Sequence, residues 1–269
     1  MPAILGIDAA WTEGGSSGIA LLKDDSRGWN CIAADRSYAD FLSRAGLACQ
    51  DLDGPLPNTI PNPHALLSAA TNLLGGSKVD VVAVDIPVAT VPVSGRRVAD
   101  DMISSEFGTN WCGTHSPSGT RPGKVGTRIS EGFSALGYPL AAETQAGGTP
   151  KVIEVFPHVA LLRMLGVTCR VPYKVGKSIR YYPDYSLHVR KKLLLIELAR
   201  ILRALRQEIC GITLELPTAT MVKSLSSLKP FEDVMDAIVC AWVGICYLEK
   251  KARPCGNDTA AIWVPDPRG

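Results

Sequence analysis

The 269-residue chain has no C-x-x-C pair, no apolar run long enough for a membrane span and no large excess of either charge. Its eight cysteines stand apart, which is atypical of structural zinc sites and of secreted disulfide frameworks. The longest clean apolar stretch, residues 237–248, is shorter than the roughly 20 residues that cross a bilayer. No basic segment precedes the first apolar run, as a signal peptide would require. We therefore expect a cytoplasmic protein with reduced thiols and no membrane partner.

The sequence also lacks a Walker A loop and a dinucleotide-binding fingerprint, so two common nucleotide sites are not indicated. The formal charge of +2 is too small to indicate a partner, but between residues 163 and 206 eleven Lys or Arg stand against Asp184 and Glu197. A solvated helix face and a surface that meets phosphates both explain this concentration. Nucleic acid is thus a candidate partner, and the oligomeric state stays open.

Hydrophobic patterning predicts an alternation of strands and helices along the whole chain. The expected strands are residues 3–10, 18–23, 29–34, 79–86 and 151–156, with a further edge segment around Trp263. The expected helices are residues 37–49, 64–74, 96–107, 128–136, 158–165, 186–208 and 231–251. Short Gly, Ser and Asp turns separate the first three strands, which favours an antiparallel meander. The β-branched strand 79–86 follows a helix and is typical of a central, parallel position.

This order of elements predicts an α/β fold with a ribonuclease-H-like mixed sheet, in which three antiparallel strands adjoin parallel ones. Helices are expected on both faces of the sheet. We predict a single domain over residues 1–269, with a loop-rich insertion after the fourth strand at about 95–150 and a basic helical segment at about 158–226.

Carboxylates end two of the most apolar strands. Asp8 closes the apolar part of the first strand in GID, and Asp85 closes the fourth in AVDIP. If these strands are parallel neighbours, both acids lie at the sheet edge where open α/β sheets bind ligands. Two such carboxylates repel each other unless a cation lies between them or one takes a proton.

Two further elements carry acids in apolar surroundings. Glu154 stands in the middle of a strand, while Glu232, Asp233 and Asp236 share the start of the last helix. Acids in a first turn favour the helix dipole, which is an ordinary reading of Glu232 and Asp233, but apolar residues follow Asp236 directly.

The acids form two overlapping predicted sets. The catalytic candidates are Asp8, Asp85, Glu154 and Asp236, and the metal ligands are Asp8, Asp85, Asp233 and Asp236. Oxygen ligands alone select hard cations such as Mg²⁺ or Mn²⁺. Ions held in this way can activate water for phosphodiester cleavage.

Five motifs together resemble the DUF429 family, which is described as predicted nucleases with a ribonuclease-H-like fold. They are GIDAAW, VDIPV followed by GRRVAD, IEVFPHVAL, YK at 173–174 and KPFEDVMDAIVCAW, and the resemblance runs from Gly6 to about Gly244. The resemblance implies catalytic roles for Asp8, Asp85 and Asp236, with Glu154 as a fourth candidate. It also implies that Arg97 and Asp100 belong to the site region. Lys174 is a candidate for contacting a substrate phosphate, and a solvated loop lysine is the alternative reading.

Three functions follow from these observations. The first is a metal-dependent phosphodiester hydrolase, a nuclease whose substrate is DNA, RNA or a small phosphoester. The second is a non-catalytic module that binds nucleic acid or another ligand on the same fold. The third is an actin- or sugar-kinase-like phosphotransferase, because GIDAAW and the turn at residues 14–18 resemble the first phosphate loop of those enzymes.

Overall fold

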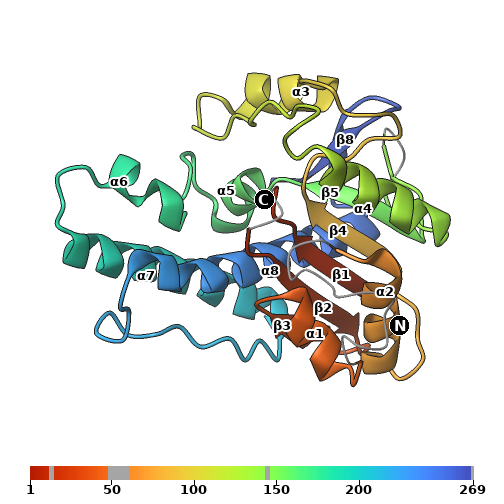
Figure 1. Ribbon diagram of the computed structural model, residues 1–269, viewed down its shortest axis with the longest axis horizontal. Coiled ribbons are helices and arrows are strands. Elements are labelled where there is room, and N and C mark those ends of the chain that lie inside the picture. The colour runs from red at the N-terminus through yellow and green to blue at the C-terminus, as the bar shows by residue number, and fades with distance from the viewer. Residues whose placement is uncertain (12–14, 48–60, 143–145, 268–269) are drawn as a thin grey trace.

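The computed structural model describes residues 1–11, 15–47, 61–142 and 146–267, and Figure 1 shows a mixed sheet flanked by helices. Within these residues the sheet has eight strands in the order β6-β3-β2-β1-β4-β5-β8-β7. The strands are β1 (Ala3–Asp8), β2 (Gly18–Asp24), β3 (Trp29–Asp35), β4 (Val81–Asp85), β5 (Lys151–Val155), β6 (Ile209–Cys210), β7 (Ala252–Gly256) and β8 (Ala261–Pro265). The fold is therefore a mixed α/β fold.

Helices lie on both faces of this sheet (Figure 1). They are α1 (Tyr38–Arg44), α2 (Pro63–Leu73), α3 (Val98–Phe107), α4 (Lys124–Ala135), α5 (Pro157–Leu165), α6 (Ser178–Tyr181), α7 (Leu187–Glu208) and α8 (Lys229–Leu248). One face packs against α5, α7 and α8, and the other against α1, α2 and α4. Within the described residues, none of the helices combines the length and the apolar character of a membrane span.

The pairing of the first four strands is as predicted. β1 to β3 form an antiparallel meander, with Asp8 opposite Gly18 in the register of β1 and β2. β4 pairs with the other side of β1 in parallel, and β5 pairs with β4 in parallel. The insertion between β4 and β5 carries α3 and α4, close to the predicted helical segments.

The two ends of the sheet differ from the prediction. The segment around Trp263 is not an edge strand, because β8 pairs with β5 on one side and with β7 on the other. The edge strand β7 was missed since Pro254 interrupts its pattern, although proline is tolerated in strands at a sheet edge. The helix expected to reach Lys251 ends at Leu248, and Lys250 adopts a φ of 58° as the chain turns into β7.

Further differences concern short elements. Strand β6 is two residues long and pairs in parallel with β3, so it is too short for a sequence pattern to reveal. The first predicted helix ends at Arg44 within the described residues, while Ala48 and Cys49 lie outside them.

Two glycines allow α8 to lie directly on the sheet. A Cβ on Gly6 would stand 2.1 Å from the carbonyl oxygen of Ala237, and one on Gly18 would stand 2.1 Å from that of Asp233. Both distances are far below contact, so a side chain at either position would push the helix away. This close packing brings the first turns of α8 to the carboxyl end of β1.

Candidate functional site

Asp8 and Asp85 lie side by side at the ends of neighbouring parallel strands. They are register partners in the β1–β4 ladder. Ile4 in β1 and Ala83 in β4 belong to the core that packs on α8. Residues an even number of positions apart share one face of a strand, so Asp8 and Asp85 lie on that face as well. Asp8 is 8% exposed. Among the described residues, neither carboxylate makes a hydrogen bond or a close ion pair with a side chain. The predicted pairing of these acids is therefore observed.

Both carboxyl groups have a raised pKa. Burial raises the pKa of Asp8 well above its ordinary value, with Asp236, Asp233 and Asp85 adding to the effect. Burial also raises the pKa of Asp85 to about 7, and nearby acids contribute. In both cases Lys174 is the strongest opposing influence. The pair therefore lies where a negative charge is costly and a cation is favoured.

Asp236 reaches the same place from α8, as the sequence predicted, but its carboxylate already has two donors. The hydroxyl of Tyr173 donates to Oδ1 at 2.5 Å, and the ammonium of Lys174 donates to Oδ2. Burial nevertheless raises the pKa of Asp236. This residue helps to hold Lys174 beside the pair of strand acids.

Asp233 is likewise bonded through both carboxylate oxygens, one turn nearer the start of α8. The hydroxyl of Ser16 donates to Oδ2, and the ammonium of Lys229 donates to Oδ1. Lys229 also lies 2.9 Å from Glu232, whose other oxygen accepts from the backbone N–H of Val175 at 2.6 Å. The acids of α8 are thus neutralised within the protein.

Lys174 lies at the centre of the charged cluster, which we define as Asp8, Asp85, Lys174, Lys229, Glu232, Asp233 and Asp236. Its ammonium contacts Asp236 and lies 3.4 Å from Glu232, with the side chain 19% exposed. The pKa of Lys174 is raised well above its ordinary value, because the surrounding acids outweigh burial. Five carboxyl groups share two ammonium groups, so the cluster carries an excess of formal negative charge.

The metal-ligand set predicted from sequence is only partly available in this arrangement. Within the described part of the chain, no three His, Cys, Asp or Glu side chains are grouped so as to hold a metal ion. Asp233 and Asp236 would first have to release their lysines. Of the four predicted metal ligands, only Asp8 and Asp85 have carboxylate oxygens that are not engaged by described side chains.

Glu154 does not join the cluster, which corrects the expectation that all four catalytic candidates lie together. Val84, its register partner, and Val152 both belong to the core on the opposite face of the sheet from α8, and strand alternation places Glu154 with them. Its carboxylate oxygens accept from Arg97 at 2.6 and 2.7 Å and from the backbone N–H of Val88 at 3.0 Å. Glu154 is thus a buried partner of Arg97.

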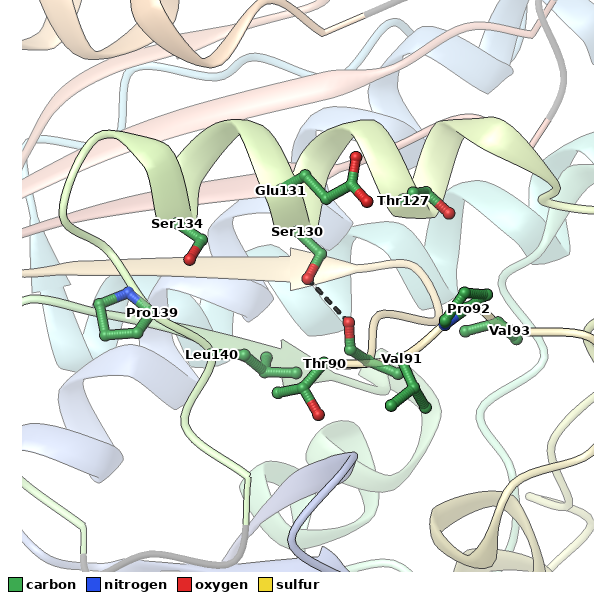
Figure 2. A pocket seen from close by; sticks show the side chains of 11 residues that line it. Thr90, Val91, Pro92, Val93, Thr127, Ser130, Glu131, Ser134, Pro139 and Leu140 are labelled. Atoms are coloured by element: carbon green, nitrogen blue, oxygen red, sulfur yellow. Dashed lines mark hydrogen bonds between the residues drawn. The ribbon is translucent and has the colours of Figure 1, made fainter.

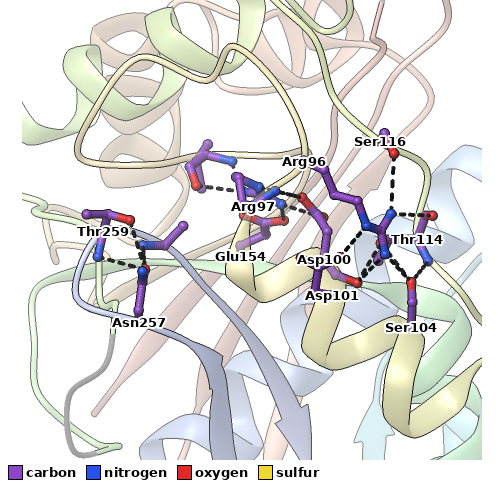
Figure 3. Close-up of polar contacts among 12 residues, drawn as sticks. Arg96, Arg97, Asp100, Asp101, Ser104, Thr114, Ser116, Glu154, Asn257 and Thr259 are labelled. Atoms are coloured by element: carbon purple, nitrogen blue, oxygen red, sulfur yellow. Dashed lines mark hydrogen bonds and ion pairs between the residues drawn. The ribbon is translucent and has the colours of Figure 1, made fainter.

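Arg97 is correspondingly not available to a substrate phosphate. Its five N–H donors are all used, by the carboxylates of Asp100 and Glu154 and by the carbonyl oxygen of Val88. Figure 3 shows Arg97 directed to Glu154, whereas the neighbouring Arg96 points to Asp101 and Ser104. The side chain of Arg97 is 9% exposed. It joins the start of α3 to β5 and does not bind substrate in this arrangement.

Sequence reasoning missed two members of the site. Lys229 was overlooked, although its spacing of three and four residues from Glu232 and Asp233 on a helix would have indicated a shared face. Cys240 lies fully buried one turn after Asp236, and burial together with Asp85 and Asp8 raises the pKa of its thiol. The thiol therefore stays protonated and fills space beneath the cluster.

A cavity of about 360 Å³ lies between α4 and the chain that follows β4. Figure 2 shows that Thr127, Ser130, Glu131 and Ser134 line it from α4, and that the hydroxyl of Ser130 donates to a carbonyl oxygen of the facing chain. None of the cluster residues lines this cavity as described. It is separate from the carboxylate site.

Residues 6–260 match the family described as "Protein of unknown function (DUF429)". The chain belongs to the DUF429 family. No curated protein and no solved structure matches it significantly. The DUF429 match spans every member of the charged cluster, from Asp8 in β1 to Asp236 in α8.

Proposed function

We propose that this DUF429 chain is a divalent-metal-dependent phosphodiester hydrolase with a ribonuclease-H-like fold. The observation that carries the proposal is the pair of the buried Asp8 and the half-buried Asp85, in register at the carboxyl ends of parallel strands with no described side-chain donor. The central strand order β3-β2-β1-β4-β5, antiparallel and then parallel, supports the fold assignment. Two adjacent carboxylates of this kind either take a proton or are stabilised by a cation.

The donor set fits Mg²⁺ or Mn²⁺. Mg²⁺ keeps several waters and is bound through one or two carboxylates together with substrate phosphates, and Asp8 and Asp85 supply two carboxylates. A divalent ion held there would activate a water molecule and neutralise charge on the phosphate oxygens.

The remaining residues of the charged cluster would neutralise a bound phosphate and hold the groups around it in place. Lys174 acts strongly on both Asp8 and Asp85, so a phosphate bound at these acids would lie within its reach. Tyr173 and Asp236 hold the ammonium of Lys174 in place through their shared hydrogen bonds. Ser16 and Lys229 hold Asp233, which fixes the first turns of α8 over the ends of β1 and β2.

The phosphotransferase alternative has less support from the turn after β1. Within the described residues, Ser16 donates to Asp233, and the hydroxyl of Ser17 accepts from the backbone N–H of Ala10 at 3.1 Å. Both serine hydroxyls of this turn are therefore used within the protein. Gly14, the first residue of the turn in the predicted phosphate loop, lies outside the described residues.

The non-catalytic alternative has one observation in its favour. Lys174 and Lys229 act as counter-ions for the acids of α8, so these acids are balanced by the chain itself. A module that binds nucleic acid through the basic segment would keep this arrangement and would not respond to metal.

Thermal unfolding and hydrolysis assays with Mn²⁺ distinguish these functions. At about 100 times the dissociation constant, Mn²⁺ should stabilise the wild type by roughly 2.7 kcal/mol, a rise of several degrees in Tm. Asp85→Asn should show no rise and should not cleave a labelled oligonucleotide. Asp101→Asn, at an exposed acid on α3, serves as the matched control and should behave as the wild type.

Two results would overturn the proposal. One is a wild type that neither binds Mn²⁺ nor cleaves any phosphodiester in its presence, which favours the binding module. The other is Asp85→Asn that cleaves as fast as the wild type, because the reaction would then not use the strand acids.

A further inference from the structure

A second site lies next to the charged cluster. A pocket of about 220 Å³ opens between the end of α3 and the chain around α6, and its described lining contains no acid. The residues that the argument uses are Trp111, His115, Arg170, Lys177, Arg180 and Tyr181. Three permanent cations and two large aromatic rings thus face one small cavity.

Hydrogen bonds between two chain segments hold the pocket in shape. The backbone N–H of Arg170 donates to the carbonyl oxygen of Asn110 at 2.9 Å, and the side-chain amide of Asn110 donates to the carbonyl oxygen of Thr168 at 2.6 Å. Trp111 follows in the left-handed region with a φ of 62°, which is uncommon for a bulky residue. Its ring is 66% exposed. The structure therefore holds an indole out of the core at the mouth of the pocket.

The pocket is strongly cationic. Burial lowers the pKa of His115, and so do Lys177, Arg170, Arg121 and Arg180. His115 is therefore neutral at pH 7 and serves as a hydrogen-bonding group beside the fixed charges. Arginine and lysine side chains around a small cavity are suited to a phosphate group.

Contacting side chains connect the pocket to the charged cluster. Arg170 bonds to the ring nitrogen Nε2 of His158, and the ring of His158 lies 5.6 Å from that of Tyr173, centroid to centroid. Tyr173 in turn donates to Asp236. A ligand in the pocket is thus separated from the carboxylates by only a few side chains. The pocket and the charged cluster therefore suit two adjacent parts of one extended ligand.

We propose that this pocket binds one nucleotide unit of a single-stranded nucleic acid, with its phosphate on Arg170, Lys177 and Arg180 and its base stacked on Trp111. A base can stack on an exposed indole only when it is free of its own helix, which favours single strands over duplexes. Single-stranded nucleic acid as the substrate class rests on the proposed hydrolase function. Binding in the pocket does not, because no residue of the charged cluster lines it.

The test is equilibrium binding of a fluorescently labelled oligothymidylate in EDTA, by anisotropy, to the full chain. Lys177→Gln combined with Arg180→Gln should weaken binding at least tenfold. The slope of log affinity against log salt should fall by about 1.4, because each contact to a single-stranded phosphate contributes about 0.7. Trp111→Ala should weaken binding about 5- to 150-fold, and an oligonucleotide with abasic sites should remove that difference.

The matched control is Lys192→Gln combined with Arg203→Gln, which removes the same charge from exposed positions on α7. It should change affinity less than threefold. An equal loss in this control would overturn the pocket, because general attraction to the basic segment would then explain binding. Equal affinity for a duplex would overturn the single-strand assignment, and undiminished binding by Trp111→Ala would overturn the stacking of a base.

Failure of the pocket and failure of the hydrolase function are distinguishable. If the wild type does not bind the oligothymidylate in EDTA but still cleaves small phosphodiesters with Mn²⁺, the pocket proposal is contradicted and the hydrolase proposal is not. Tight, pocket-dependent binding without cleavage supports the pocket and contradicts the hydrolase. Because Lys177, Arg180 and Trp111 are exposed, unchanged Tm values for their variants confirm that folding is unaffected.

Discussion

Asp8 and Asp85 occupy the same register position on two adjacent parallel strands, so the sheet itself sets the separation of their Cα atoms. Neither residue can move away from the other without breaking the ladder at the centre of the sheet. Burial is the main cause of the raised pKa of each, and Asp236 raises the pKa of both further. The energetic cost of ionising these two carboxyl groups is thus set by the fold and is present before any ligand binds.

The first prediction concerns pH and Asp85→Asn in EDTA. The pKa of Asp85 is about 7 in the folded chain against an ordinary 3.8, so the folded state holds a proton that the unfolded state loses. Stability of the wild type therefore falls as pH rises from about 4 to 7. The variant lacks this loss and should be more stable at pH 8 by roughly 1 to 4 kcal/mol.

Urea unfolding at pH 4.5 and pH 8 measures this difference. The advantage of Asp85→Asn should shrink strongly at pH 4.5, where the wild-type carboxyl is protonated. A variant that is less stable than the wild type at pH 8 would contradict the assignment of a strained, unpaired carboxylate.

The second prediction concerns the pair formed by Lys174 and Asp236. Lys174→Met should destabilise the protein by about 3 kcal/mol, because it leaves buried carboxylates without their ammonium. Asp236→Asn removes one of those charges, so the double variant should lose less than the sum of the two single variants. Urea unfolding of all four proteins gives the coupling energy, and strict additivity would show that the ion pair contributes nothing.

The third prediction compares two adjacent arginines. Arg97→Ala leaves Glu154 and Asp100 buried and unpaired and should cost about 3 to 5 kcal/mol. Arg96→Ala should cost much less, because its carboxylate partner Asp101 is 68% exposed. Arg97→Lys should also be destabilising, since one ammonium cannot replace five N–H donors. If Arg96→Ala were the more damaging change, the structural role given to Arg97 would be wrong.

The fourth prediction concerns the contact between α8 and the sheet. Gly6→Ala should destabilise the protein strongly, because the added Cβ meets the backbone of α8 and not a flexible side chain. Gly95→Ala is the control, since a Cβ there meets nothing within 4 Å. Circular dichroism melting curves should show a large fall in Tm for the first variant and little change for the second. A tolerated alanine at Gly6 would contradict the close packing of α8.

The sequence was sufficient to predict the central sheet and the meeting of Asp8 with Asp85, because both follow from apolar strands that end in an acid. The sequence was also sufficient to predict that Asp236 lies close to these two acids. Glu154 was misplaced because its apolar neighbours show burial but not which face of the sheet is buried. Only its register with Val84 settles that. Arg97 could not be assigned from sequence, since its partner Glu154 is 57 residues away.

The charged cluster draws on both extremes of the fold, with Asp8 in the first strand and Asp236 in the last helix. During synthesis on the ribosome, β1, β4 and Lys174 all emerge before α8, so Lys174 then lacks Asp236, the carboxylate to which it donates in the folded chain. A nascent chain that stops short of α8 therefore carries an exposed apolar sheet face and an acidic pair whose lysine is not yet held in place. Such a chain is a natural target for chaperones and proteases, and the site assembles only once α8 has been synthesised.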